Sequence, residues 1–179
     1  GRVSDPEFLN GQIPVAPSAI ACEGMVSHLS PERPFVVPRA LRSEEIADIV
    51  DDFSVAAQNA LSASFDGVEI HGANGYLIDQ FLRESTNLRD DEYGGPPQNR
   101  VRFLREVLEA LISIWGADRV GLRLSPNGET QGCDDSDPPA IFGEAARVVE
   151  QLGLAFLELR EPGPQGTFGQ TEVPKQSPL

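Results

Sequence analysis

Between residues 43 and 160, three helix-like segments alternate with three strand-like segments, and this order constrains the fold more than any other feature. Apolar residues recur at helical spacing in the segments 43–64, 99–116 and 138–153. Each segment is followed by a short apolar run that is typical of a strand, at 67–71, 119–125 and 155–159. Helices and strands that alternate along a chain predict an α/β protein built on a parallel sheet.

Local signals predict where these helices begin and end. Ser43, followed by two glutamates, is typical of an N-cap with an acidic first turn. Asp137 before Pro138 is typical of a helix start with proline at the first helical position. Gly116 and Gly153 follow the second and third helical patterns, where glycine commonly ends a helix.

Two segments lie outside the alternation. Residues 1–42 and 161–179 are rich in proline and glycine and are predicted to be irregular. The loop between His71 and Asn99 is longer than a compact connection needs, and loops of this length are usually functional or disordered. Its acidic segment 90–95 is either a solvated turn or packs back through the arginines that follow it.

The chain of 179 residues is predicted to form one partial domain. Three strands cannot close a barrel, and in an open sheet they leave two unpaired edges. A complete eightfold barrel typically takes about 250 residues. The sequence starts at Gly1 without an initiator methionine, which leaves its natural start open. These features are typical of the middle portion of a larger barrel.

The composition argues against several classes of protein. A net charge of −14 disfavours nucleic acid and anionic membrane surfaces as partners, because both require a positive face. No run approaches the roughly 18 apolar residues of a membrane span, and no secretory signal is visible. The two cysteines, Cys22 and Cys133, form no CxxC pair. We therefore expect free thiols, no disulfide framework, no metal site and a cytoplasmic location.

Three polar side chains follow the strand-like run 67–71 at close spacing: His71, Asn74 and Tyr76. The carboxyl ends of parallel strands are where barrel and doubly wound enzymes hold their catalytic groups. The cluster therefore favours an enzyme. Each residue also has a structural interpretation. The histidine could be a hydrogen-bonded structural group, Asn74 and Gly75 an ordinary turn, and the tyrosine a core residue.

Short motifs along the whole chain resemble the old yellow enzyme family. These motifs occur in the family order at residues 1–4, 11–19, 71–76, 80–82, 87–95, 99–100, 122–126 and 159–162. The members of this family are flavin-dependent ene-reductases built on a (β/α)8 TIM barrel, with FMN at its carboxyl-end mouth. The resemblance implies that residues 43–160 supply about strands four to six of such a barrel. The family's first three strands and its last two, whose loops hold the FMN phosphate, have no counterpart in this chain.

The resemblance also implies roles for four side chains. His71 and Asn74 match the pair that hydrogen-bonds the substrate oxygen above the flavin, so His71 also lies against the cofactor. Tyr76 matches the proton donor to the alkene, and a phenol is neutral at pH 7 and can give up a proton. Arg123 matches the arginine near the flavin pyrimidine edge, where a permanent cation stabilises negative charge. An arginine in a strand could instead be a buried ion-pair member.

The function implied by the resemblance is that of an FMN-dependent oxidoreductase. NADPH or NADH would reduce FMN, and the flavin would pass a hydride to the activated C=C of an α,β-unsaturated carbonyl or nitro compound. The expected partners are a small-molecule alkene and either a second copy of the chain or a complementing chain segment. The alternative is an incomplete, flavin-free fragment that acts only as a structural or assembly piece.

Overall fold

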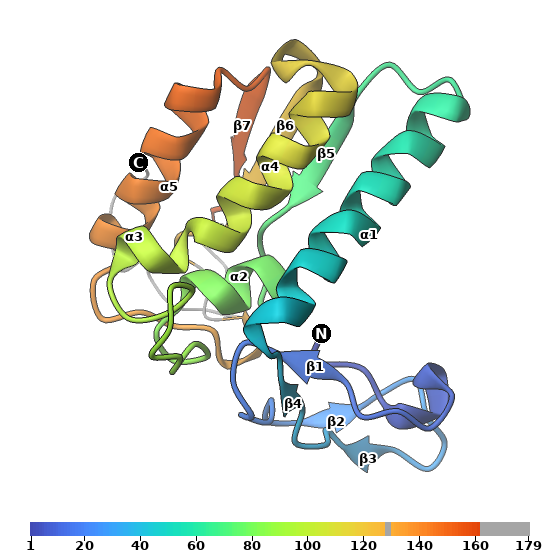
Figure 1. Cartoon of the computed structure of the whole chain (residues 1–179). Coiled ribbons are helices and arrows are strands. Elements are labelled where there is room, and N and C mark those ends of the chain that lie inside the picture. The colour runs from blue at the N-terminus through green and yellow to red at the C-terminus, as the bar shows by residue number, and fades with distance from the viewer. Residues whose placement is uncertain (128–129, 162–179) are drawn as a thin grey trace.

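The computed structural model describes residues 1–127 and 130–161, and its main element is a three-stranded parallel sheet (Figure 1). The strands lie in the order β5 (Val68–His71), β6 (Val120–Leu124) and β7 (Phe156–Leu159). The prediction of three adjacent parallel strands is confirmed. In the register of the sheet, His71 lies beside Arg123, and Arg123 lies beside Glu158.

Three long helices lie side by side along this sheet: α1 (Ser43–Ser62), α4 (Arg102–Trp115) and α5 (Pro138–Leu152) (Figure 1). They cover one face of the sheet, as the alternation of side chains along the strands demonstrates. The strand side chains on the helix face are buried, and these include Ile70, Val120, Leu122 and Leu124. Those on the opposite face are largely exposed, and these include Glu69, His71, Phe156 and Glu158.

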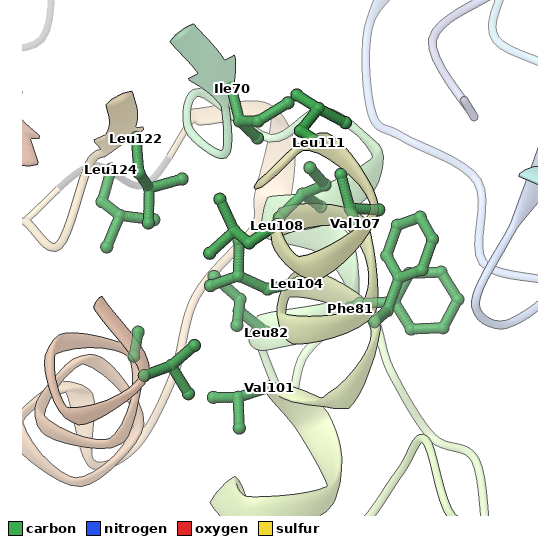
Figure 2. Packing of buried hydrophobic residues seen from close by; sticks show 14 of the residues in the cluster. Ile70, Phe81, Leu82, Val101, Leu104, Val107, Leu108, Leu111, Leu122 and Leu124 are labelled. Carbon is green, nitrogen blue, oxygen red and sulfur yellow. The ribbon is translucent and has the colours of Figure 1, made fainter. Parts of the chain in front are cut away.

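The hydrophobic core lies between α4 and the sheet (Figure 2). One stripe of α4 is fully or nearly fully buried and consists of Leu104, Val107, Leu108 and Leu111. It packs with the buried strand residues and with Phe81 and Leu82 of α2 (Leu77–Leu82). Full burial of a side chain of this size contributes about 1.5–3 kcal/mol, so this layer fixes α4 against the strands.

The helix ends agree with the sequence signals in three cases and differ in two, and the first agreement is Gly116, which is the C-cap of α4 as predicted. The Asp137 side chain accepts a hydrogen bond from the backbone N–H of Ala140 and caps α5 as predicted, and Gly153 ends that helix with a left-handed φ of 66°. The N-cap predicted at Ser43 is wrong. Arg42 is the N-cap, and its backbone N–H donates to Glu45 Oε2 at 2.8 Å, while the Ser43 hydroxyl donates to Asp91.

The helix predicted from Asn99 is in fact two helices, α3 (Pro97–Arg100) and α4, separated by Val101. The Arg100 side chain turns inward at this point and donates to the Leu82 carbonyl at 2.5 Å and to the carboxylate of Asp135. Val101 is itself 3% exposed. The consecutive side chains of Arg100 and Val101 are therefore both buried at the break between α3 and α4.

Residues 1–42 were predicted to be irregular but carry short elements. These are the 3-10 helix η1 (Pro6–Leu9), the parallel pair β1 (Val15–Ala16) and β4 (Arg39–Ala40), and the antiparallel pair β2 (Met25–Val26) and β3 (Arg33–Pro34). Two further 3-10 turns are η2 (Ala117–Arg119) and η3 (Thr130–Gly132). The tail predicted to be irregular at 161–179 lies outside the described residues except for Glu161.

The long loop after β5 packs onto the protein. The Asn87 side chain donates to the carbonyls of Phe81 and Tyr93, at 2.7 and 2.8 Å, and thereby closes the loop on itself. Arg102 donates from Nε to the Glu92 carbonyl at 3.1 Å, so one of the two arginines after segment 90–95 holds it in place, whereas Arg100 bonds elsewhere. No helix in the described residues is long and apolar enough to cross a membrane.

Candidate active site

The carboxyl edge of β5 and β6 brings together the four residues singled out in the sequence. His71 is the last residue of β5 and is paired with Arg123 of β6. The chain then stays close to β6, because Gly72 donates from its backbone N–H to the Arg123 carbonyl at 2.8 Å. A Cβ at Gly72 would lie 3.1 Å from that oxygen, so the glycine permits this close approach.

The next turn places Asn74 and Tyr76 beside the histidine. Asn74 and Gly75 both have left-handed backbones, with φ of 60° and 75°. The ring of Tyr76 lies 5.6 Å from the ring of His71, centroid to centroid, at an interplanar angle of 55°. Tyr76 is 44% exposed, so the interpretation of this tyrosine as a core residue is wrong. The turn thus presents an imidazole and a phenol to the same region.

The environment of His71 favours the neutral imidazole. Partial burial lowers the pKa of His71 below its usual 6.5, and the neighbouring charge of Arg123 lowers it further. At pH 7 the ring therefore carries one N–H donor and one bare nitrogen. A neutral histidine can donate one hydrogen bond to a carbonyl or nitro oxygen.

Arg123 is both an ion-pair member and a group with unused hydrogen-bonding capacity. Its Nε lies 3.4 Å from Glu158 Oε1, so the ion-pair interpretation has support, but the pair is not buried, since the two side chains are 35% and 44% exposed. The two atoms are not aligned as a hydrogen bond, and Arg123 Nε is buried without a hydrogen-bond partner among the described residues. The side-chain oxygen Oδ1 of Asn74 is likewise buried and unpartnered within 1–127 and 130–161.

These two unpartnered atoms test whether the edge fits a flavin. A buried polar atom without a partner costs free energy, so the site is suited to a ligand that supplies hydrogen-bonding groups. The isoalloxazine ring has such groups along its pyrimidine edge, and a permanent cation beside it favours the reduced, negatively charged form. Arg123 and Asn74 therefore fit FMN chemically, and the neutral ring of His71 adds one further N–H donor beside them.

Two acidic residues on the exposed face were not singled out from the sequence. Glu69 of β5 and Glu158 of β7 lie on the same face of the sheet as His71 and Arg123. Burial raises the pKa of Glu69, and the hydrogen bond and charge of Glu158 raise it further. The signal was present in the strand 68–71, whose alternate residues Glu69 and His71 are charged or polar where a core strand would be apolar, and in the single charged residue Glu158 of the strand 156–159.

Three other titratable residues, Cys133, Tyr93 and Asp91, have structural roles. Cys133 is fully buried, and burial raises the pKa of its thiol to about 12, which makes it unreactive. Tyr93 donates its hydroxyl to Glu106, and burial raises its pKa to about 12. The hydrogen bond from Arg89 is the main cause that lowers the pKa of Asp91 to about 2. Residues 1–127 and 130–161 contain no group of three side chains that could hold a metal ion.

Comparison with known proteins identifies the family. The model of the NADH:flavin oxidoreductase / NADH oxidase family matches residues 5–176. The chain belongs to this family. It is 47% identical to putative 12-oxophytodienoate reductase 10 of Oryza sativa subsp. japonica over 153 residues, which are 86% of this chain and 48% of that protein. It is 48% identical to a probable flavin mononucleotide-dependent alkene reductase of Leishmania infantum over 150 residues, 81% of this chain and 41% of that protein.

Solved structures of family members have the same fold over most of the chain. The old yellow enzyme homologue from Zymomonas mobilis matches with a TM-score of 0.91 and 49% identity, over 98% of this chain and 49% of that one. Morphinone reductase matches with a TM-score of 0.84 and 43% identity, over 89% and 44%. The resemblance to the old yellow enzymes is thus confirmed. The chain spans about half the length of the relatives that it matches.

Proposed function

We propose that the complete protein is an FMN-dependent ene-reductase that uses NADPH or NADH. Its substrate would be the activated C=C of an α,β-unsaturated carbonyl or nitro compound. The observation that carries this proposal is the grouping of His71, Asn74, Tyr76 and Arg123 at the carboxyl edge of one parallel sheet. A relative named as an alkene reductase and a morphinone reductase structure solved with tetrahydroNAD support the two half-reactions.

We propose further that β5, β6 and β7 are about strands four to six of a (β/α)8 barrel. Among the described residues, β5 and β7 each have one unpaired edge, and one face of the sheet lacks covering helices. A barrel provides a neighbour for both edges and encloses the uncovered face. FMN would then lie at the mouth, where His71 ends β5 and Arg123 lies one residue before the end of β6.

His71 and Arg123 would hold FMN, and the chemistry that the cofactor would supply is hydride transfer from the nicotinamide to the β carbon of the alkene. The side chains of His71 and Asn74 would donate hydrogen bonds to the substrate oxygen and stabilise the negative charge that develops on it. Tyr76 would then protonate the α carbon, a step that a carboxylate ionised at pH 7 could not perform. Arg123 would stabilise negative charge at the flavin edge.

The alternative of a flavin-free structural piece receives no comparable support. It leaves the buried, unpartnered atoms Asn74 Oδ1 and Arg123 Nε without a purpose. It also does not explain why an imidazole and a phenol lie 5.6 Å apart, centroid to centroid, on the open side of the sheet. A homo-oligomer, a complementing segment and a cytoplasmic location stay predictions.

The test combines flavin retention with ligand binding. The purified protein should be yellow, should be reduced by NADPH or NADH, and should be reoxidised by an enone without oxygen. A His71→Ala/Asn74→Ala double variant should bind a phenol or enone much more weakly, since each lost hydrogen bond to a charged group costs about 1.5–3 kcal/mol. Reduction of the flavin by nicotinamide should change far less.

A matched double variant controls for nonspecific effects. His28 and Asn59 are exposed and distant from the site in sequence, so His28→Ala/Asn59→Ala should bind the phenol like the wild type. A protein that holds FMN while the His71/Asn74 double variant keeps wild-type ligand affinity would contradict the assigned roles. A protein that binds no flavin would contradict the proposed function itself.

A further inference from the structure

The turn at Asn74 and Gly75 leads directly to Tyr76, and three of its backbone polar groups are bound by buried side chains. The Asn74 N–H donates to Ser125 Oγ at 2.9 Å. The Gly75 N–H donates to Asp79 Oδ2 at 2.8 Å. The Gly75 carbonyl accepts from Gln80 Nε2 at 2.7 Å. Both N–H groups of this turn and the Gly75 carbonyl are thus held by side chains rather than by regular secondary structure.

These three side chains, which we call the buried clamp (Asp79, Gln80 and Ser125), are themselves fully buried, each with 0% exposure. Arg83 ties two of them together. It donates from Nε to Asp79 Oδ1 at 3.0 Å and from Nη2 to the Ser125 carbonyl at 2.6 Å. The guanidinium also lies 4.5 Å from the ring centroid of Phe142 on α5. The clamp is therefore anchored to α2, to the end of β6 and to α5.

Charge and shape both make the clamp rigid. Burial raises the pKa of Asp79, and the Arg83 charge and the donors from Gly75, Arg83 and Ser125 oppose that rise and favour the carboxylate. The charged part of this network, Asp79 with Arg83 and Ser125, holds its geometry tightly, because losing one partner leaves another unpaired. Gln80 is held through Nε2 alone, since its Oε1 is buried without a partner among the described residues. Gly75 adds a steric limit, since a Cβ there would lie 2.5 Å from the Thr130 carbonyl oxygen.

We infer that the buried clamp positions Asn74 relative to Tyr76, and that it does so through the left-handed turn at 74–75. This inference rests on the proposed function of those two side chains. Asn74 and Tyr76 are separated by a single residue, so a rotation of the peptide between Asn74 and Gly75 moves the amide and the phenol apart. Misplacement of a reacting group by about 1 Å can cost on the order of 10²-fold in rate.

None of the clamp residues contacts substrate in this scheme. They act through the backbone and are positioning residues. Their substitution should therefore slow the reaction with the alkene, because that reaction needs the Asn74 amide and the Tyr76 phenol at the correct distance from each other. It should spare reduction of the flavin by nicotinamide, which does not need the proton from Tyr76.

The first variant is Ser125→Ala, which removes a single oxygen and leaves the Asn74 N–H without an acceptor. In the flavin-loaded protein we expect hydrogen exchange at the Asn74 amide to accelerate, while exchange at the Gly72 amide, which bonds to the Arg123 carbonyl, stays the same. Reoxidation by an enone should slow by about 10–100-fold. Ser125→Thr, which keeps a hydroxyl, should restore both the exchange rate and the enone rate.

Two further variants complete the experiment. Gln80→Met removes the donor to the Gly75 carbonyl at similar volume, and it should slow the enone reaction even if Ser125→Ala yields too little folded protein. Ser54→Ala is the matched control, because its hydroxyl also bonds to one backbone group, the Val50 carbonyl, but on α1. Ser54→Ala should leave amide exchange at Asn74 and the enone rate unchanged.

The results separate the clamp from the proposed function. Unchanged exchange at Asn74 in Ser125→Ala, or faster exchange with an unaltered enone rate, would overturn the positioning role. Equal slowing of enone reoxidation and nicotinamide reduction would also overturn it, since that pattern indicates a displaced flavin. A wild-type protein that holds reducible FMN but reduces no enone would refute the proposed function instead.

Discussion

Gly75 offers a test of the site's architecture that needs neither flavin nor substrate. Its φ of +75° lies in the left-handed region, and an added Cβ would meet the Thr130 carbonyl oxygen at 2.5 Å and Gln131 Cβ at 2.9 Å. Real Cβ atoms essentially never come this close to other atoms, and here one of the two neighbours is backbone. Gly75→Ala must therefore strain its own backbone and displace η3 as well.

The magnitude follows from two separable effects. A left-handed backbone costs an L-residue about 1–2 kcal/mol. Overpacking a tight site typically adds about 1–3 kcal/mol. Together they predict a loss of roughly 2–5 kcal/mol in the free energy of unfolding, against the 5–15 kcal/mol that a typical domain possesses.

Alanine substitutions at two other glycines separate the cost of backbone strain from the cost of overpacking. Gly153 has a φ of +66° with no atom within 4 Å of an added Cβ, so Gly153→Ala should cost only the backbone strain. Gly143 lies inside α5 with open space around it, and Gly143→Ala should stabilise the helix by about 0.5–1 kcal/mol. The difference between Gly75→Ala and Gly153→Ala is the steric contribution alone.

The assay is equilibrium unfolding in urea, followed by the fluorescence of Trp115, the single tryptophan, which is 7% exposed. Equal slopes with urea concentration among the variants make the free energies comparable. Equal destabilisation by Gly75→Ala and Gly153→Ala would refute the close contact between the 74–75 turn and η3.

Three further predictions concern the site and the core. Tyr76→Phe keeps the ring and removes the acid, so reoxidation by an enone should slow by about 10²–10⁴-fold while reoxidation by a quinone stays nearly constant; equal slowing with both acceptors would remove Tyr76 from proton transfer. Because the pKa of His71 is lowered in the folded state, the unfolded chain binds more protons as the pH falls below 6.5. Stability should decrease there, and less so in His71→Ala, as urea unfolding between pH 7 and 5 would measure; identical pH profiles would contradict the shift. Leu108→Ala, at a residue with 0% exposure, should destabilise by about 2–5 kcal/mol in the same assay, whereas a loss below 1 kcal/mol would place Leu108 outside the core.

The sequence predicts the helix–strand units well because each has an amphipathic or apolar pattern long enough to detect. The helix α2 escapes detection for a physical reason. It has only six residues, and five of them, from Ile78 to Leu82, are buried, so it has almost no polar face to create a helical period. Its polar members Asp79 and Gln80 face partners in the loops rather than solvent.

The same distinction explains which part of the site could be predicted. His71 and Arg123 could be placed at one edge because parallel strands end at the same side of a sheet. Asn74 and Tyr76 follow within five residues of the end of β5, so they lie at the same edge of the sheet as His71. The buried clamp could not be predicted, because Ser125 and Asp79 are 46 residues apart and meet only when β6 and α2 pack. The Asn74 N–H likewise finds its acceptor 51 residues away.

The two faces of the sheet differ in polarity, and this difference bears on the proposed barrel. Parallel sheets are normally covered on both faces, and their strands are then apolar throughout. Here the helix face is apolar, whereas the opposite face carries Glu69, His71, Arg123 and Glu158. Covering that face with an apolar layer would bury four titratable groups at a high cost in desolvation. In the proposed barrel, the surroundings of this face must therefore be polar near its carboxyl edge, as the mouth of a barrel that holds a polar cofactor would be.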